Sequence, residues 1–213
     1  MDGVIALGGK HPSKFIQKLR ELPAIGADSG FDFLWKYRFN VKFVLGDFDS
    51  IQLLPQNVGV PYRVFPKEKD ESDAELAFIY AEKELGWKSW SVIGGSGERI
   101  DHFLALLSLA PRYPAWNEWW MENDHGILLS SQRGMVCSSQ PGQRVSIIPL
   151  GIIVPKVVSE GLRWPIDSLD WKSQVSLSNE TTNQQFSIYC EVGHIIILRD
   201  LEVALEFGIR SID

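Results

Sequence analysis

The chain has 213 residues, of which 45% are hydrophobic and 23% are charged. This balance predicts one large or two small globular domains and excludes a disordered chain. The formal net charge of −6, together with the lack of any basic run in the sequence, argues against a broad nucleic-acid-binding surface.

The first half of the chain alternates short apolar runs with segments of helical spacing. Strands are expected at residues 4–7, 24–27, 41–45, 62–65 and 89–93. Helices are expected at residues 11–22, 31–37, 72–85 and 101–110. The third of these helices has the clearest ends, because Ser72 and Glu75 form a capping box and Gly86 stands where a terminating glycine belongs. This alternation predicts an α/β domain with a mostly parallel sheet and helices on both faces.

The pattern changes after about residue 124, where helical periodicity disappears. Short apolar or alternating runs follow at residues 127–129, 145–149, 152–158, 174–177, 186–192 and 195–198. Glycine and proline separate these runs, as in an antiparallel β-sandwich. We therefore expect two domains, an α/β domain at residues 1–122 and a β-sandwich domain at residues 123–213.

The cysteine usage and the hydropathy of the sequence indicate where in the cell the protein is located. Cys137 and Cys190 form no CxxC pair and lack the spacing of metal ligands. No apolar run approaches the ~20 residues of a membrane span, and the first residues do not resemble a signal peptide. We expect a cytoplasmic protein with neither nucleic acid nor membrane among its partners.

Acidic residues follow four of the expected strands. Asp28, Asp47 with Asp49, the segment 69–73 and Asp101 all come after a strand of the first half. A single carboxylate in such a place is usually a turn residue or a helix cap, and Ser72 fits the role of a cap. Four of them at one sheet edge would repel each other unless a cation neutralised them. Oxygen ligands of this kind suit Mg²⁺ shared with substrate phosphates.

A glycine-rich loop lies between the fifth strand and the fourth helix. Gly94, Gly95 and Gly97 let backbone amides approach a phosphate at a helix N-terminus, and Arg99 adds a fork of donors. The glycines alone are weak evidence, because turns need them anyway. His102 is as easily a packing residue as a functional one.

The second half contains fewer chemical signals. Trp164 could stack on a flat heterocycle, although one of eight tryptophans is more simply explained as a packing residue. Ser178 and Asn179 have the composition of an ordinary turn.

Seven segments in order make the chain resemble the thiamine pyrophosphokinase family over residues 4–198. They are residues 27–30, 46–50, 69–75, 94–102, 145–150, 161–165 and 178–180. Each segment is weak evidence alone, and their common order is strong evidence. The chain departs from the family pattern at Ser29 and Glu98, where glycine is common, and at Ser72, where threonine is usual.

The resemblance implies an ATP-binding α/β catalytic domain followed by a β-sandwich that binds thiamine and forms a homodimer. The active sites would lie at the subunit interface. The reaction would transfer pyrophosphate from ATP to the thiamine hydroxyl, with Mg²⁺, giving thiamine diphosphate and AMP.

The resemblance also implies roles for individual residues. The catalytic carboxylates would be Asp47, Asp49, Asp73 and Asp101, of which the first three would hold the metal. The residues near ATP would be Asp28, Lys69, Asp70, Ser72 and Arg99. Thiamine would contact Trp164, Ser178 and Asn179. Either Asp73 or Asp101 would orient the hydroxyl or accept its proton.

Three other functions stay open on the sequence. A pyrophosphokinase for another hydroxymethyl heterocycle, such as a pterin, would use the same phosphate edge. A metal-dependent phosphohydrolase would use the same carboxylates on water. A nucleotide-binding module without catalysis would bind ATP and Mg²⁺ only, and Ser29 and Glu98 are the features that favour it.

Overall fold

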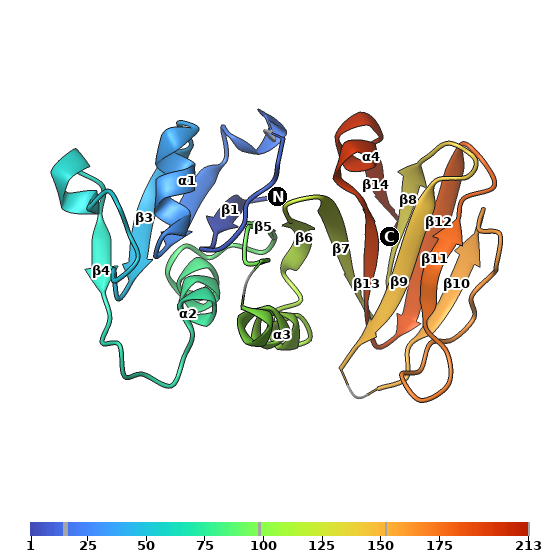
Figure 1. Cartoon of the computed structure of the whole chain (residues 1–213). Helices are drawn as coiled ribbons and strands as arrows, with labels where there is room; N and C mark the ends of the chain where they lie inside the picture. Colours follow the sequence, from blue (N-terminus) through green and yellow to red (C-terminus); the bar gives the residue numbers. More distant parts are fainter. Residues whose placement is uncertain (15–16, 98, 152, 213) are drawn as a thin grey trace. The chain divides into compact units, whose positions relative to one another are not determined.

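The computed structural model describes residues 1–14, 17–97, 99–151 and 153–212, which form two compact units (Figure 1). The first unit comprises Met1–Leu109 and Ala115–Glu122, and the second comprises Ala110–Pro114 and Asn123–Asp213. Among the described helices, none has the length and apolar character needed to cross a bilayer.

The first unit is built on six parallel strands. They are β1 (Gly3–Ala6), β2 (Pro23–Ala27), β3 (Asn40–Gly46), β4 (Tyr62–Val64), β5 (Trp90–Ile93) and β6 (Trp116–Trp120). Their order in the sheet is β4-β3-β2-β1-β5-β6, and Ile5 pairs with Ile25 on one side and with Val92 on the other. The chain moves outward from β1 first in one direction and then in the other. This reversal puts the topological switch point between β1 and β5.

Helices cover both faces of this sheet. They are α1 (Gly30–Lys36), α2 (Asp73–Ile79) and α3 (Ile100–Leu109), with short 3₁₀ turns η1 (Gln17–Leu19) and η2 (Pro55–Val58). A Cβ on Gly26 of β2 would lie 2.8 Å from Phe31 of α1, whereas a Cβ on Gly3 of β1 would strike Trp87, which follows α2. Ala6 pairs with Gly26, so the two residues face the same side of the sheet. Gly3 lies three positions before Ala6 in β1 and therefore faces the other side. Therefore α1 and the segment after α2 lie on opposite faces, and the predicted α/β architecture is confirmed.

The helix expected over residues 11–22 is wrong for the part of that segment that the structure describes. The structure has only η1 there, and residues 15–16 lie outside the described residues. The Lys10 amide donates to Ser96 O at 2.7 Å, which joins the start of the segment to the loop after β5. Pro12 further disfavours helical backbone in the residue before it. Among the described apolar residues of this segment, Leu19 is buried.

The helix expected over residues 72–85 forms in two parts. α2 begins with Ser72 as its N-cap, whose Oγ accepts a hydrogen bond from the Glu75 amide at 3.2 Å. A π-helical segment, η3 (Tyr80–Glu84), continues it. Gly86 then adopts a φ of +67°, the left-handed conformation expected of a terminating glycine.

The second unit contains two antiparallel sheets. One has the order β11-β9-β13-β7 and the other β10-β12-β8-β14. Their strands are β7 (Asp124–Ser130), β8 (Arg133–Ser138), β9 (Arg144–Leu150), β10 (Lys156–Glu160), β11 (Ser176–Glu180), β12 (Gln185–Val192), β13 (His194–Asp200) and β14 (Ile209–Ile212). A short helix, α4 (Leu201–Glu206), connects the last two strands. The predicted antiparallel β domain is thus confirmed.

Alternating residues of both sheets form the core of this unit. Ile127, Ile147 and Ile197 come from one sheet, and Cys137 and Ile188 come from the other. Cys137 and Cys190 are both buried free thiols, and they do not form a disulfide. Their strands pair with Cys137 opposite Phe186 and Cys190 opposite Arg133, which leaves the two thiols four positions apart in register.

Candidate active site

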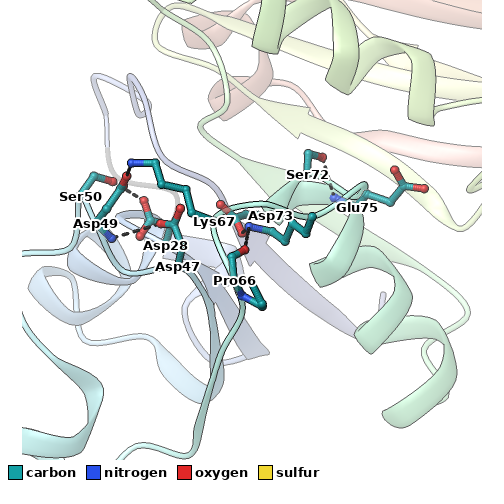
Figure 2. A network of polar contacts seen from close by, with 10 residues as sticks. Asp28, Asp47, Asp49, Ser50, Pro66, Lys67, Ser72, Asp73 and Glu75 are labelled. Atoms are coloured by element: carbon teal, nitrogen blue, oxygen red, sulfur yellow. Dashed lines mark hydrogen bonds and ion pairs between the residues drawn. The ribbon is translucent and has the colours of Figure 1, made fainter.

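Three carboxylates converge where β2 and β3 end. Asp28 follows β2, and Asp47 and Asp49 follow β3. One oxygen from each of the three lies within 4.8 Å of the others. Figure 2 shows these side chains gathered on two adjacent loops. Parallel strands deliver their carboxyl ends to one edge of a sheet, which explains how residues twenty positions apart meet.

The backbone at this edge adopts unusual conformations. Asp28 and Phe48 have φ values of +48° and +62°, and Gly46 has a φ of +145°. The Asp28 amide donates to Leu45 O at 2.8 Å, and a Cβ on Gly46 would lie 3.1 Å from Asp28. Left-handed conformations at non-glycine residues cost ~1–3 kcal/mol each and cluster at functional sites. The loops are therefore held close together with their carboxylates converging, at a cost in backbone energy.

One lysine lies directly against this cluster. Lys67 Nζ is 2.5 Å from Asp49 Oδ2, and this ion pair lowers the pKa of Asp49 and raises that of Lys67. The Asp49 amide also donates to Asp47 Oδ1 at 3.1 Å. Lys67 was not predicted, although the Lys-x-Lys pattern it forms with Lys69 in the loop before α2 is visible in the sequence.

Asp73 lies at the first turn of α2 and outside the three-carboxylate cluster. Its Oδ1 is 3.1 Å from Lys69 Nζ, and Lys69 also donates to Pro66 O at 3.2 Å. Burial raises the pKa of Asp73 despite the opposing effect of Lys69, and the charges of Asp47 and Asp28 raise it further. Asp73 is therefore electrostatically coupled to the cluster, and its carboxylate is a stronger base than an exposed one.

The cluster has the chemistry of a divalent-cation site. Asp28 Oδ2 accepts a hydrogen bond from Ser50 Oγ, while the buried Asp28 Oδ1 has no hydrogen-bond partner among the residues that the structure describes. A buried carboxylate oxygen without a donor is costly unless a cation or a ligand reaches it. Three carboxylates around one point supply the hard oxygen atoms that Mg²⁺ prefers.

Arg99 and Asp101 form a pair at the start of α3. Two hydrogen bonds, of 2.9 Å from Nε and 2.6 Å from Nη2, join the guanidinium to the carboxylate. This pairing holds the pKa of Asp101 well below its usual range. Both side chains are exposed, as is Asp70, while Glu98 lies outside the described residues. This pairing of Arg99 with Asp101 was not predicted.

In the second unit, Asn179 holds the backbone of Trp164 from both sides. Asn179 Nδ2 donates to Trp164 O at 2.7 Å, and its Oδ1 accepts from the Trp164 amide at 3.2 Å. Asn179 is only 1% exposed, whereas Trp164 is 52% exposed. Arg163 lies over the indole at 4.9 Å and pairs with Glu180 at 2.7 Å. The backbone that carries the indole is thus held by Asn179, while about half of the Trp164 side chain remains accessible.

The segment around Ser178 is not the turn that its composition indicated. It lies in β11, where the pairing with β9 is irregular between Ser176 and Asn179. Ser178 has a φ of +51°, and its amide donates to Ser146 Oγ at 2.9 Å. This bulge turns Asn179 inward toward Trp164, which composition alone could not indicate.

Family models match most of the chain. A model described as thiamin pyrophosphokinase, catalytic domain, matches residues 20–118, and one described as thiamin pyrophosphokinase, vitamin B1 binding domain, matches residues 130–195. Among curated proteins, no sequence matches the chain significantly.

Solved structures with the same fold include three thiamin pyrophosphokinases or family members. A Bacillus subtilis protein has a TM-score of 0.73 at 22% identity, covering 92% of this chain and 98% of its own. An Enterococcus faecalis protein has a TM-score of 0.72 at 19% identity, covering 94% and 99%. The yeast protein has a TM-score of 0.69 at 14% identity, covering 96% and 88%. At these identities the likeness establishes the fold.

Proposed function

Because the chain belongs to the thiamin pyrophosphokinase family, we propose that Asp28, Asp47 and Asp49 form the Mg²⁺ site of its reaction. The enzyme transfers pyrophosphate from ATP to the hydroxyl of thiamine, giving AMP and thiamine diphosphate. The observation that carries the metal assignment is the convergence of three carboxylates within 4.8 Å, one of them with a buried oxygen lacking a donor.

Transfer requires one bond to form and one to break. The thiamine hydroxyl oxygen attacks the β-phosphorus of ATP, the bond from that phosphorus to the α-phosphate oxygen breaks, and AMP leaves. A bound Mg²⁺ would neutralise charge on the phosphate oxygens. The protein's own contribution is mainly positioning and charge neutralisation, as in other phosphoryl transfers.

We propose that Asp73, rather than Asp101, is the base that accepts the proton of the thiamine hydroxyl. A base accepts a proton better when its pKa is raised toward the working pH. Burial raises the pKa of Asp73, whereas Arg99 lowers that of Asp101. Lys69 Nζ lies 3.1 Å from Asp73 Oδ1. Its positive charge would therefore lie beside the negative charge that develops as the hydroxyl loses its proton.

Lys67, Lys69 and Arg99 are proposed to neutralise phosphate oxygens. Lys67 and Arg99 are exposed and each is paired with a carboxylate, so a triphosphate can replace or share those partners. Asp70 and Ser72 complete the proposed ATP-binding set, with Ser72 acting chiefly as the cap of α2.

The second unit supplies the proposed thiamine surface. The exposed indole of Trp164 would stack on the thiamine pyrimidine, and Ser178 and Asn179 would border the thiamine site, with Asn179 also holding the Trp164 backbone. On this assignment residues 1–122 form the ATP-binding catalytic domain and residues 123–213 the thiamine-binding domain.

We further propose a cytoplasmic homodimer with active sites at the subunit interface. In addition to Trp164, the second unit exposes Trp171 and Leu177, which are 63% and 64% accessible. Where such side chains form one contiguous patch, they mark a surface that another chain covers. Sedimentation equilibrium measures the mass directly, and a monomer at micromolar concentration would refute the dimer.

The decisive assay incubates the protein with ATP, Mg²⁺ and thiamine and follows AMP and thiamine diphosphate together. We expect equal amounts of the two products and none when EDTA removes the metal. Phosphate release without thiamine would instead indicate a phosphohydrolase. Nucleotide binding without turnover would indicate a binding module, and preference for a pterin would indicate another pyrophosphokinase.

A further inference from the structure

The indole of Trp119 reaches from β6 to the glycine-rich loop after β5. Trp119 is fully buried, and its Nε1 donates a hydrogen bond to Gly94 O at 2.6 Å. Gly94 is the first residue of that loop, directly after β5. A side chain of the neighbouring strand therefore fixes the point at which the loop leaves the sheet.

The peptide group between Gly94 and Gly95 is held at both ends. Its carbonyl accepts from the Trp119 indole, and its amide donates to Gly8 O at 2.9 Å. Gly94 and Gly95 adopt φ values of +84° and +71°, conformations that other residues rarely reach. Glycine residues can adopt many backbone conformations, so the chain alone does not determine the shape of this turn. The two hydrogen bonds hold it in one of those conformations.

The residue after this peptide, Ser96, is also held by a backbone hydrogen bond. Ser96 O accepts from the Lys10 amide at 2.7 Å, so the loop after β5 is joined to the loop after β1 across the switch point. Ligands bind at such a switch point in open α/β sheets. Ser96 forms an antiparallel bridge with Lys10, so the Gly97 amide that follows is the donor that a loop of this kind offers to a phosphate.

The same indole also contacts α3. The rings of Trp119 and Phe103 lie 5.1 Å apart at an interplanar angle of 31°. The Phe103 amide donates to Arg99 O at 3.1 Å, so this contact lies one helical turn from the proposed phosphate ligand Arg99. Trp119 thus contacts both segments that would approach the triphosphate.

We propose that Trp119 is a positioning residue that presets the loop at residues 94–97 for the triphosphate of ATP. This inference rests on the proposed phosphate-binding role of that loop. Trp119 is buried and contacts the loop rather than the substrate, so its effect should appear in nucleotide affinity. Preorganisation of this kind removes an ordering cost from binding.

The test replaces Trp119 with phenylalanine, which keeps an aromatic ring and removes the N–H donor. Trp116→Phe is the control, because Trp116 is buried in the same strand and its Nε1 donates to Glu118 O at 2.9 Å rather than to the loop. The Trp116 ring meets that of Trp119 edge-on at 5.5 Å, and phenylalanine keeps an aromatic ring at that contact. Binding of α,β-methylene-ATP with Mg²⁺ is measured by calorimetry, since that analogue cannot be cleaved at the bond that breaks in the reaction.

We expect Trp119→Phe to raise the Kd for the analogue and the KM for ATP about tenfold, the usual effect of leaving one buried acceptor unsatisfied. The KM for thiamine and kcat at saturating ATP should change less than threefold. Trp116→Phe should lower the melting temperature by a similar amount without changing nucleotide affinity. Equal losses of affinity in both variants, or in neither, would overturn the proposal.

Two further measurements separate this inference from the role of the loop itself. Gly97→Ala strains a residue with a φ of +128°, so it should weaken nucleotide binding if the loop contacts phosphate. An unchanged affinity in Gly97→Ala would overturn the loop assignment and the inference together. In the wild-type protein, labelled at its indole nitrogens, the Trp119 N–H should already resist exchange with solvent before the analogue binds, and rapid exchange in the free protein would overturn the inference.

Discussion

In the first unit the proposed ligands carry full charges and are incompletely neutralised, whereas in the second unit the proposed ligand is an aromatic ring held by a neutral amide. Asp28, Asp47 and Asp49 have one lysine, Lys67, bonded to a single one of them. Trp164 is held by Asn179, and the charges beside it, Arg163 and Glu180, pair with each other. On the proposed assignment a cation from outside would complete the first arrangement, whereas the second needs no added charge.

The largest expected effect comes from breaking the charged arrangement. Asp49→Asn should lower kcat by about 10³-fold, because a lost electrostatic contact to the transition state costs this order of rate. Its melting temperature without ligand should not fall, because one of three mutually repelling charges is removed. Steady-state assay and calorimetry measure the two quantities, with the exposed Glu71→Gln as the control. Turnover like that of the wild type would refute the metal role.

Removing the aromatic ring tests the other arrangement. Trp164→Ala should raise the KM for thiamine about tenfold, since one stacking contact to a ring contributes ~1–3 kcal/mol. The KM for ATP should remain unchanged. Trp164→Phe should recover most of the loss, because it restores a flat ring on the same backbone. A parallel rise in both KM values would contradict the division of substrates between the two units.

The coupling of Asp73 to the cluster gives a smaller effect that depends on pH. Burial raises its pKa, so the folded state disfavours the ionised form. The resulting loss of stability is absent in acid, appears as pH rises above the ordinary carboxyl pKa, and is complete above the raised one. Asp73→Asn should therefore be more stable than the wild type at pH 7, with no difference near pH 3.

Urea unfolding at several pH values measures this difference. A variant that is equally destabilised at every pH would show that the pairing with Lys69 outweighs burial. The same variant should lose turnover, since it lacks the proposed base. Retained turnover would instead mean that another group accepts the proton of the thiamine hydroxyl.

The smallest effect is expected for the exposed ion pair. Lys67 lowers the pKa of Asp49, so the pair adds stability above the ordinary carboxyl pKa, and that stability is lost as pH falls through the lowered one. Both groups are exposed, and 0.5 M NaCl should remove the contribution. Lys67→Met should therefore scarcely change the melting temperature while raising the KM for ATP. A large thermal shift would mean that the pair is structural.

Local signals in the sequence predicted the strands and the residues at their ends. Apolar runs located β2 and β3, and the parallel arrangement then brought Asp28 and Asp47 to the same edge. The capping residues located the start of α2. These features depend on a few neighbouring residues, which is why one sequence sufficed.

Features set by distant contacts could not be predicted in this way. The segment after Lys10 has helical spacing, but its backbone is joined to the loop at Ser96, 86 positions away. Ser178 looks like a turn residue but lies in a bulged strand whose shape depends on Ser146. The reach of Trp119 to Gly94 depends on the pairing of β5 with β6, and no strand was expected where β6 forms.

The proposed metal site at the three converging carboxylates would also affect how long the folded protein survives in a cell. A binder that prefers the folded state stabilises it by RT ln(1 + [L]/Kd), about 2.7 kcal/mol at a hundredfold excess over Kd. Without a cation, the mutual repulsion of Asp28, Asp47 and Asp49 opposes folding. Starvation for Mg²⁺ or ATP would therefore increase the unfolded fraction that proteases remove. The abundance of this enzyme would then follow the supply of its own substrates, without any dedicated regulatory site.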